Sequence, residues 1–341
     1  GPGEYTKRAF LSGKLDLTAA EGIRELVSAQ SKQEWQAARS LATGGLAKEI
    51  NGLRNALVEA MAYLEARIDF PDEGDTQDTH LDDVYARVKK VDDRVGALLQ
   101  TWDNGRVAAE GLKVALIGLP NAGKSTLLNA LLKSDRAIVT AIAGTTRDYI
   151  EEKCMLNGRL FRLVDTAGIR DSDDQVEKIG IEQSIQISRD ADIVVAMVGA
   201  DTPPAEAEKI DVLVDGCDAD VIKITTKSDL GLGIGWEGSV PISCYNSDGL
   251  DILKDLLVEA VDSHLNKLED KVYITTERHR SALEETQISL KRFFDSYESG
   301  GFDECLAFEL QEASRSLVSI IGVVGVEDIL DKVFSQFCVG K

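Results

Sequence analysis

Apolar residues recur at three- and four-residue steps in the first part of the chain, which is the spacing of one face of an α-helix. A helix is expected to begin at Thr18, because Thr18 and Glu21 have the spacing of a capping box. Two longer apolar stripes follow, separated by residues 70–74, whose sequence FPDEG breaks the periodicity. Such stripes are typical of the core of a helical bundle rather than of a cofactor-binding surface. Their members are Leu46, Ile50, Leu53, Leu57, Met61, Leu64 and Ile68, then Leu81, Val84, Val88, Val91, Val95, Leu98 and Trp102.

The middle of the chain changes to short apolar runs that alternate with helical spacing, as in a doubly wound sheet. The continuous apolar run at residues 113–118 is typical of a buried parallel strand. Asn157-Gly158 predicts a tight turn between strands at residues 149–156 and 159–164, which gives the sheet one antiparallel edge. Helical periodicity returns after Asp270, through Leu283, Leu290, Phe294, Leu306, Leu310, Leu317, Ile329, Val333 and Phe337.

The helices before and after the middle segment cannot each bury an apolar face alone, so we expect them to pack together. The chain then consists of a helical domain in two parts, residues 1–111 and 267–341, with residues 112–266 inserted as a separate domain. The expected fold class is α/β plus all-α, in which a doubly wound, mostly parallel sheet interrupts a discontinuous helical bundle.

Residues 118–125 read GLPNAGKS and match the phosphate-binding pattern GxxxxGK[ST]. An apolar strand precedes this loop and helical spacing follows it over residues 126–133; the alternative is an ordinary glycine turn before a helix. Backbone N–H groups of such a P-loop surround a β-phosphate, and the helix N-terminus adds partial positive charge. Lys124 is expected to bind the β/γ-phosphate oxygens and act in catalysis, and the Ser125 hydroxyl is expected to ligate Mg²⁺. The expected phosphate-binding residues are Asn121, Ala122, Gly123, Lys124, Ser125 and Thr126.

Two polar segments downstream have the order that a guanine-nucleotide-binding domain requires. Residues 165–168, DTAG, end an apolar run, so Asp165 is expected to hold Mg²⁺ through water and the Gly168 N–H to contact a γ-phosphate. Residues 144–148, GTTRD, precede that strand, and Thr146 is the candidate second protein ligand of Mg²⁺. Together with the P-loop, these segments predict that the inserted domain is a P-loop GTPase (G) domain.

Residues 226–229, TKSD, follow an apolar strand at residues 221–225 and resemble the guanine-reading motif NKxD. Asp229 is expected to accept two hydrogen bonds from the guanine N1 and N2 groups, which adenine cannot offer. Thr226 stands where the motif usually has asparagine, and a hydroxyl replaces only part of the hydrogen bonding of an amide. We therefore expect guanine selectivity with modest affinity and rapid exchange. Residues 240–244 are interpreted as the last strand and its base-contacting loop. The expected base-contacting residues are Thr226, Lys227, Asp229, Ser243 and Cys244.

The residue after Gly168 is Ile169, at the position where many small GTPases have the glutamine that orients the attacking water. Isoleucine has no hydrogen-bonding group, so another side chain must position this water. The nearby candidates are Asp173, Asp174 and Glu177, and the alternative for each is a solvated loop charge. The P-loop also contains no evident arginine finger, which usually compensates the charge of the transferring phosphoryl group.

The chain has 341 residues, with 38 Lys and Arg against 59 Asp and Glu, for a formal net charge of −21. A body of this charge repels nucleic acid, so any RNA contact requires a local patch, a missing segment or a partner. The 5 cysteines and 3 histidines show no metal-ligand spacing, which favours free thiols in a reducing, cytoplasmic setting. No membrane association is expected, since no apolar run reaches the length of a span and no signal sequence opens the chain. The leading Gly1-Pro2 is interpreted as a remnant of recombinant expression, with native residues removed ahead of Gly3.

Four segments give the chain a resemblance, over its whole length, to the MnmE (TrmE) family of tRNA modification GTPases: residues 3–17 (GEYTKRAFLSGKLDL), 118–125, 144–148 and 337–341 (FCVGK). The resemblance implies a three-part protein whose amino-terminal domain, absent here, forms the homodimer and binds a folate one-carbon carrier. It also implies a partner, the FAD- and NADH-using protein MnmG (GidA), with which the family installs an aminomethyl-type group at C5 of wobble uridine in certain tRNAs. In this family GTP hydrolysis drives the conformational cycle that the modification requires.

The resemblance also assigns roles residue by residue. Asn121 matches a residue that helps to coordinate K⁺, and residues 137–144 match the loop that closes over the ion. This K⁺ would sit where an arginine finger acts in other GTPases, and transient pairing of two G domains would order the loop. Glu177 matches the family's catalytic glutamate, and Cys338 matches a terminal cysteine implicated in modification, with a helix-core residue as the alternative. The implied K⁺ ligands are Asn121, Thr140, Ile142 and Thr145, and Thr140 is also expected to contact the nucleotide.

Three functions of different classes follow as hypotheses. The first is a GTP-hydrolysing component of a tRNA-modifying enzyme, which uses GTP/GDP, Mg²⁺ and K⁺. The second is a ribosome-assembly GTPase, which predicts an appended RNA-binding domain and a basic surface, and the net charge of −21 counts against it. The third is a nucleotide-dependent scaffold that only binds partners, which steady phosphate release would exclude.

Overall fold

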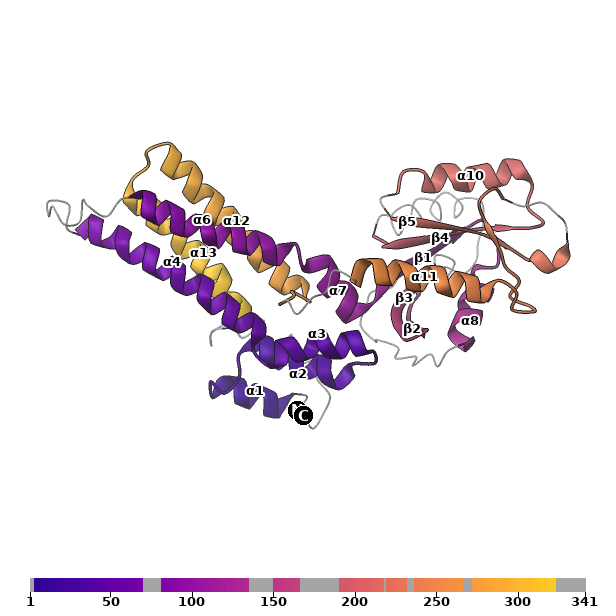
Figure 1. The fold of residues 1–341 in the computed structure, drawn as a ribbon, viewed down its shortest axis with the longest axis horizontal. Helices are drawn as coiled ribbons and strands as arrows, with labels where there is room; N and C mark the ends of the chain where they lie inside the picture. Colours follow the sequence, from indigo (N-terminus) through magenta and orange to yellow (C-terminus); the bar gives the residue numbers. More distant parts are fainter. Residues whose placement is uncertain are drawn as a thin grey trace, which may run out of the picture. The chain divides into compact units, whose positions relative to one another are not determined.

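The chain divides into two compact units in a computed structural model, one formed by Gly1–Ala109 with Leu268–Lys341 and the other by Glu110–Lys267 (Figure 1). The first unit is therefore built from both ends of the chain, and the second is inserted between them. The structure describes residues 3–69, 81–134, 150–165, 190–217, 219–231, 236–265 and 272–322.

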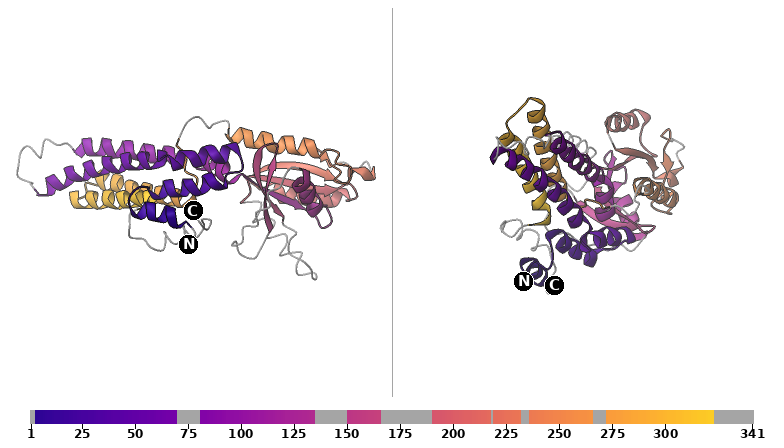
Figure 2. Two further views of the ribbon diagram at one scale, coloured as in Figure 1. Left: turned by 90° about the horizontal axis from the view of Figure 1, so that it is seen from below. Right: turned by 60° about the vertical axis from the view of Figure 1, so that its left-hand side comes forward.

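The helical unit contains a short entry region and a set of long helices. In its core, α4, α6, α12 and α13 lie side by side, as both Figure 1 and Figure 2 show. This packing confirms that the helices at the two ends of the chain bury their apolar faces against each other. The helices are α1 (Glu4–Leu11), α2 (Leu17–Ser28), α3 (Lys32–Ala42), α4 (Gly45–Asp69), α6 (Leu81–Leu99), α7 (Trp102–Glu110), α12 (Glu277–Glu298) and α13 (Asp303–Ile321).

Most residues of the predicted apolar stripes form this core or pack against it. Helix α6 ends at Leu99 and Trp102 begins the separate helix α7, but Trp102 still packs against the same core while partly buried. On α12 the buried ring is Phe293, whereas Phe294 is only partly buried and packs edge-on against Tyr85. Both phenylalanines continue the stripe from Leu290 at an allowed helical step, so spacing alone did not distinguish them. The predicted break at residues 70–74 and the predicted stripe beyond residue 322 lie outside the described residues.

The predicted capping box at Thr18 is wrong, because α2 begins earlier. Asp16 is the N-cap, and its carboxylate accepts a hydrogen bond of 2.9 Å from the backbone N–H of Ala19. The Glu21 side chain is therefore not needed as a cap, and it is buried against α12 instead. A capping box does form one helix later, between Ser31 and Glu34 at the start of α3.

The inserted unit is a six-stranded sheet in the order β2-β3-β1-β4-β5-β6, parallel except for the β2–β3 pair. Asn157 and Gly158 both have positive φ, 47° and 78°, as a tight hairpin turn between β2 and β3 requires. Helix α10 lies on one side of the sheet and α8 and α11 on the other (Figure 1). The strands are β1 (Leu112–Gly118), β2 (Ile150–Leu156), β3 (Arg159–Asp165), β4 (Ile193–Gly199), β5 (Asp220–Thr226) and β6 (Val240–Pro241). The helices are α8 (Lys124–Ser134), α10 (Pro204–Val214), α11 (Leu250–Leu265) and the 3₁₀ turn η1 (Ser228–Leu230).

The sheet confirms the predicted strand run before the P-loop and the predicted antiparallel edge. The last strand is short, since β6 pairs with β5 through Val240 and Pro241. Proline is tolerated at this edge position, and the next residue continues the pairing, because the N–H of Ile242 donates to the Thr225 carbonyl at 2.7 Å. The chain continues as the expected loop, residues 242–249. The carboxyl ends of the parallel strands β1, β4, β5 and β6 thus meet at one edge of the sheet, where α/β proteins bind ligands.

Candidate nucleotide-binding site

The P-loop has the geometry that its sequence predicts, since β1 ends at Gly118 and α8 begins at Lys124. Asn121 and Gly123 adopt left-handed backbone angles, with φ of 63° and 89°, which asparagine and glycine tolerate best. A Cβ at Gly118 would lie 2.6 Å from the carbonyl oxygen of Met197 on β4, so only glycine lets the loop start this close to β4. The loop therefore turns sharply into the N-terminus of α8, as in an anion-binding site.

The ammonium group of Lys124 lies across this loop. Its Nζ donates hydrogen bonds to the carbonyl oxygens of Gly118 at 2.7 Å and Leu119 at 3.1 Å. These bonds keep the positive charge at the loop, where phosphate oxygens can exchange with the carbonyls. Ser125 is the next residue of α8 and is exposed, a position from which a hydroxyl can reach a metal ion beside bound phosphates.

Thr226 links the base-reading motif directly to the P-loop. Its hydroxyl donates a hydrogen bond of 2.6 Å to the carbonyl oxygen of Ala122, and the Val198 carbonyl lies at 3.4 Å. The Thr226 side chain is 2% exposed, so this bond is protected from water. The hydroxyl therefore fixes one loop to the other, which is part of the hydrogen bonding that the amide of the usual asparagine would supply. A single hydroxyl proton bonds one carbonyl at a time, so the bracing is limited.

Ser243 supports the candidate base-reading carboxylate. Its hydroxyl donates to Oδ1 of Asp229 at 2.7 Å, and its oxygen accepts the backbone N–H of Tyr245 at 3.3 Å. Ser243 is fully buried whereas Asp229 is exposed, so a rigid support holds a carboxylate that solvent and ligand can reach. Burial, and then the negative charge of Asp229, raises the pKa of the neighbouring Cys244 thiol, which keeps it protonated at neutral pH.

The comparison with known proteins places this geometry in a family. A sequence model described as the MnmE helical domain matches residues 17–338. The tRNA modification GTPase MnmE of Aquifex aeolicus is 40% identical over 346 residues, which covers all of this chain and 76% of that protein. The chain belongs to the MnmE family. The MnmE proteins of Akkermansia muciniphila and Moorella thermoacetica are 38% and 39% identical, and the chain spans 75% and 76% of their lengths.

Several residues of the predicted site lie outside the described residues. They are Thr140, Ile142, Thr145, Thr146, Gly168, Glu177 and Cys338. The backbone of Asp165 ends β3 opposite Leu116 of β1, at the carboxyl edge of the sheet, and its side chain is not described. Within the described ranges, no cluster of His, Cys, Asp and Glu has the arrangement of a metal site. The roles assigned to the residues named above stay predictions.

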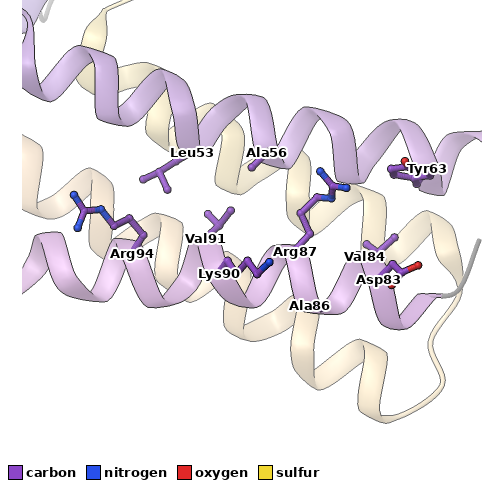
Figure 3. Close-up of a pocket in the computed structure, with 10 residues that line it drawn as sticks. All are labelled: Leu53, Ala56, Tyr63, Asp83, Val84, Ala86, Arg87, Lys90, Val91 and Arg94. Carbon is purple, nitrogen blue, oxygen red and sulfur yellow. The ribbon is translucent and has the colours of Figure 1, made fainter.

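Sequence reasoning missed two features of this MnmE family member. One is Asp201, whose carboxylate binds the ammonium of Lys227. The other is a groove of about 620 Å³ between α4 and α6 in the helical unit (Figure 3). Leu53, Val84 and Val91 line it, with Arg87, Lys90 and Arg94 on successive turns of α6. Arg87 and Arg94 are paired with Glu59 and Glu49, which neutralises much of their charge. No signal in the local sequence pattern could have shown either feature, because each joins separate elements.

No helix in the described parts of the chain has both the length and the apolar composition needed to cross a bilayer.

Proposed function

We propose that this chain hydrolyses GTP as part of tRNA modification, as its membership of the MnmE family implies. The observation that carries the proposal is the junction of the P-loop with the base-reading motif. There Thr226 bonds to Ala122 of the P-loop, and Asp229, three residues later, is supported by Ser243. A phosphate-binding loop and a carboxylate suited to guanine are thus held by one short segment of chain.

The residues present fit a magnesium nucleotide. Lys124, whose ammonium lies across the P-loop, would bind phosphate oxygens, the Ser125 hydroxyl would ligate Mg²⁺, and Asp229 would read guanine. Mg²⁺ supplies positive charge that neutralises the phosphate oxygens when it is bound. Thr146 and Asp165 would complete the Mg²⁺ surroundings, and the Gly168 N–H would contact the γ-phosphate. The helix N-terminus after Gly123 orients the phosphates towards this charge.

We further propose that hydrolysis depends on K⁺ and on pairing of two G domains. Asn121 would help to hold the ion, together with Thr140, Ile142 and Thr145, and its charge would substitute for an arginine finger. The left-handed turn at Asn121 supports this role, because it lies within the P-loop, so the side-chain amide is close to where the phosphates would bind. Glu177 would orient the attacking water, since Ile169 cannot.

The proposed setting of this activity follows the family. MnmG is the proposed FAD-dependent partner, and the wobble uridine of tRNA is the proposed site of modification. A folate carrier would bind in an amino-terminal domain that also forms the homodimer, and Cys338 is the candidate residue for the modification step. The formal charge of −21 supports a role for a partner in holding tRNA, because the chain as a whole repels polyanions.

GTP turnover in K⁺ and in Na⁺, measured at several protein concentrations, tests the proposal. We expect steady phosphate release that is faster in K⁺ and that rises more than linearly with protein concentration. Lys124→Ala should abolish turnover, whereas Lys133→Ala, an exposed lysine on the same helix, should leave it unchanged. Absence of turnover would refute hydrolysis and leave the hypothesis of a scaffold that only binds nucleotide and partners. Equal rates in K⁺ and Na⁺ at every concentration would refute the role of the cation, and a rate that is linear in protein concentration would refute the role of pairing.

A further inference from the structure

Lys227 is held by an acidic side chain from a neighbouring loop. Its ammonium lies 2.8 Å from Oδ2 and 3.1 Å from Oδ1 of Asp201, which follows β4. This lysine stands between Thr226, which bonds to the P-loop, and Asp229, the candidate base reader. Whatever fixes Lys227 therefore acts on the connection between phosphate and base recognition.

The backbone at Lys227 needs such support. Its φ of 58° and ψ of 34° are left-handed, a conformation that residues with a Cβ avoid unless their surroundings enforce it. The turn leads directly into the 3₁₀ turn that contains Asp229. The ion pair with Asp201 holds the end of the Lys227 side chain, and so restrains the turn from which this side chain extends.

The end of β4 is built to bring Asp201 to this position. Gly199 pairs with Thr226 across the parallel strands, and the N–H of Ala200 donates to the Thr226 carbonyl at 2.8 Å. A Cβ at Gly199 would lie only 2.4 Å from Oδ1 of Asp201, so glycine leaves the space that this carboxylate occupies. The loop after β4 and the loop after β5 are thus joined by backbone and by side chain.

We propose that Asp201 is a positioning residue for guanine-nucleotide binding, which acts through Lys227 on the turn that presents Asp229. This inference rests on the nucleotide binding of the proposed function and adds a residue to it. The base-reading segment is then fixed at three successive points: Thr226 to the P-loop, Lys227 to Asp201, and Asp229 to Ser243. Asp201 holds the middle point, Lys227. With Asp201 removed, the turn samples more conformations, and nucleotide binding has to restore the order.

The direction in which nucleotide affinity changes when Asp201 is replaced distinguishes a positioning role from a purely electrostatic one. Asp201 carries negative charge, and removing a negative charge beside a polyanionic ligand strengthens binding if charge alone matters. A positioning role predicts weaker binding. The same measurement tests a blocking role, in which Asp201 would compete with the nucleotide for Lys227 and its removal would also strengthen binding.

The test uses Asp201→Asn in the full chain, with fluorescent GDP and a GTP analogue as probes. We expect Kd for both nucleotides to rise roughly fivefold, the size expected for loss of a partly exposed ion pair, with faster release. The rate of hydrolysis at saturating GTP should not change, because Asp201 acts through the base-reading turn and not through the P-loop. Asp201→Glu should recover most of the affinity, since its carboxylate can still bind the ammonium.

The matched control is Asp215→Asn, the same substitution at an exposed site after α10, which should bind as the parent does. The double variant Asp201→Asn with Lys227→Met should bind no more weakly than Lys227→Met alone, because the two side chains act as one unit. Additive losses in the double variant would overturn the proposal, and so would unchanged or tighter binding by Asp201→Asn. A parent chain that binds no guanine nucleotide would instead refute the proposed function, and this inference with it.

Discussion

Glu21 on α2 and Arg278 on α12 form a two-point ion pair, although 257 positions separate them in the chain. The Arg278 Nε donates to Oε1 at 3.0 Å and its Nη2 donates to Oε2 at 2.7 Å. Arg278 also donates to the carbonyl oxygens of Ser319 and Ile320, at the end of α13. His279 completes the cluster, with Nε2 2.9 Å from Oε2 of Glu21. One buried carboxylate thus ties together helices from both ends of the chain.

Replacing this carboxylate should destabilise the helical unit. Glu21→Gln removes the charge but keeps the volume, and it leaves Arg278 without its ionic partner at a site where Glu21 is only 3% exposed. We expect the free energy of unfolding to fall by about 3 kcal/mol, as is typical when one partner of a buried pair is removed. Chemical denaturation followed by circular dichroism measures this. Glu59→Gln, in an exposed pair with Arg87, is the matched control and should cost below about 1 kcal/mol.

The same cluster should make stability depend on pH. Burial alone would raise the pKa of Glu21, but hydrogen bonds and charge from His279 and Arg278 outweigh it and lower the pKa from 4.5 to about 2. A depressed carboxyl pKa stabilises the folded state above pH 4.5, and this contribution is lost as pH falls towards 2. The difference in free energy of unfolding between the parent and Glu21→Gln should therefore decrease by roughly 2 kcal/mol as the pH falls from 6 to 3. A constant gap over that range would contradict the assignment.

Thr226→Val should weaken nucleotide binding. Valine has the shape of threonine but no hydroxyl, so the buried carbonyl of Ala122 loses its 2.6 Å hydrogen bond. An unsatisfied buried acceptor costs about 1–3 kcal/mol, or on the order of 5- to 150-fold in Kd if the cost falls on the bound state. Titration with fluorescent GDP measures it. The control is Thr43→Val, whose exposed hydroxyl bonds only within its own helix end. Unchanged affinity in Thr226→Val would show that this hydroxyl does not brace the P-loop.

Asp229→Asn should shift preference from GTP to xanthosine triphosphate, because a carboxamide complements the altered base edge. The new side chain can still accept the hydrogen bond from Ser243, so the turn should keep its shape. Competition between the two nucleotides for the variant measures the preference. Asp220→Asn, at the exposed start of β5, should keep the parental preference. If Asp229→Asn still prefers GTP, the base is read elsewhere.

Glu177→Ala should separate binding from hydrolysis. The P-loop and Asp229 make the ground-state contacts, so nucleotide affinity and G-domain pairing should survive. Loss of a water-orienting group typically slows a reaction by roughly 10²–10⁴-fold, and we expect turnover to fall at least about tenfold. Single-turnover hydrolysis in saturating K⁺ measures the effect, with Asp173→Ala as the matched change in the same acidic segment. Turnover at the parental rate would show that Glu177 does not orient the water and is a solvated loop charge.

Local patterns in the sequence determined which segments fold into which elements. The stripes in α4, α6 and α13 predicted buried helix faces, because residues three and four apart share one side of a helix whatever it packs against. The P-loop pattern and the Asn157-Gly158 turn were equally readable, since the backbone angles they need depend on a few adjacent residues. The order of the motifs along the chain predicted a nucleotide site, because parallel strands bring their carboxyl ends to one edge.

Only the tertiary structure decided which side chains meet across those elements. Thr226 and Ala122 are 104 positions apart, and Glu21 and Arg278 are 257 apart, so no local period reports that they touch. Glu21 illustrates the reason, since its spacing from Thr18 predicted a cap, yet burial beside Arg278 gave it a stronger partner. Asp201 reaches Lys227 only because β4 and β5 pair in one register and Gly199 leaves it room. Contacts of this kind depend on how the elements pack. That packing is determined by the whole chain and not by residues that are adjacent in the sequence.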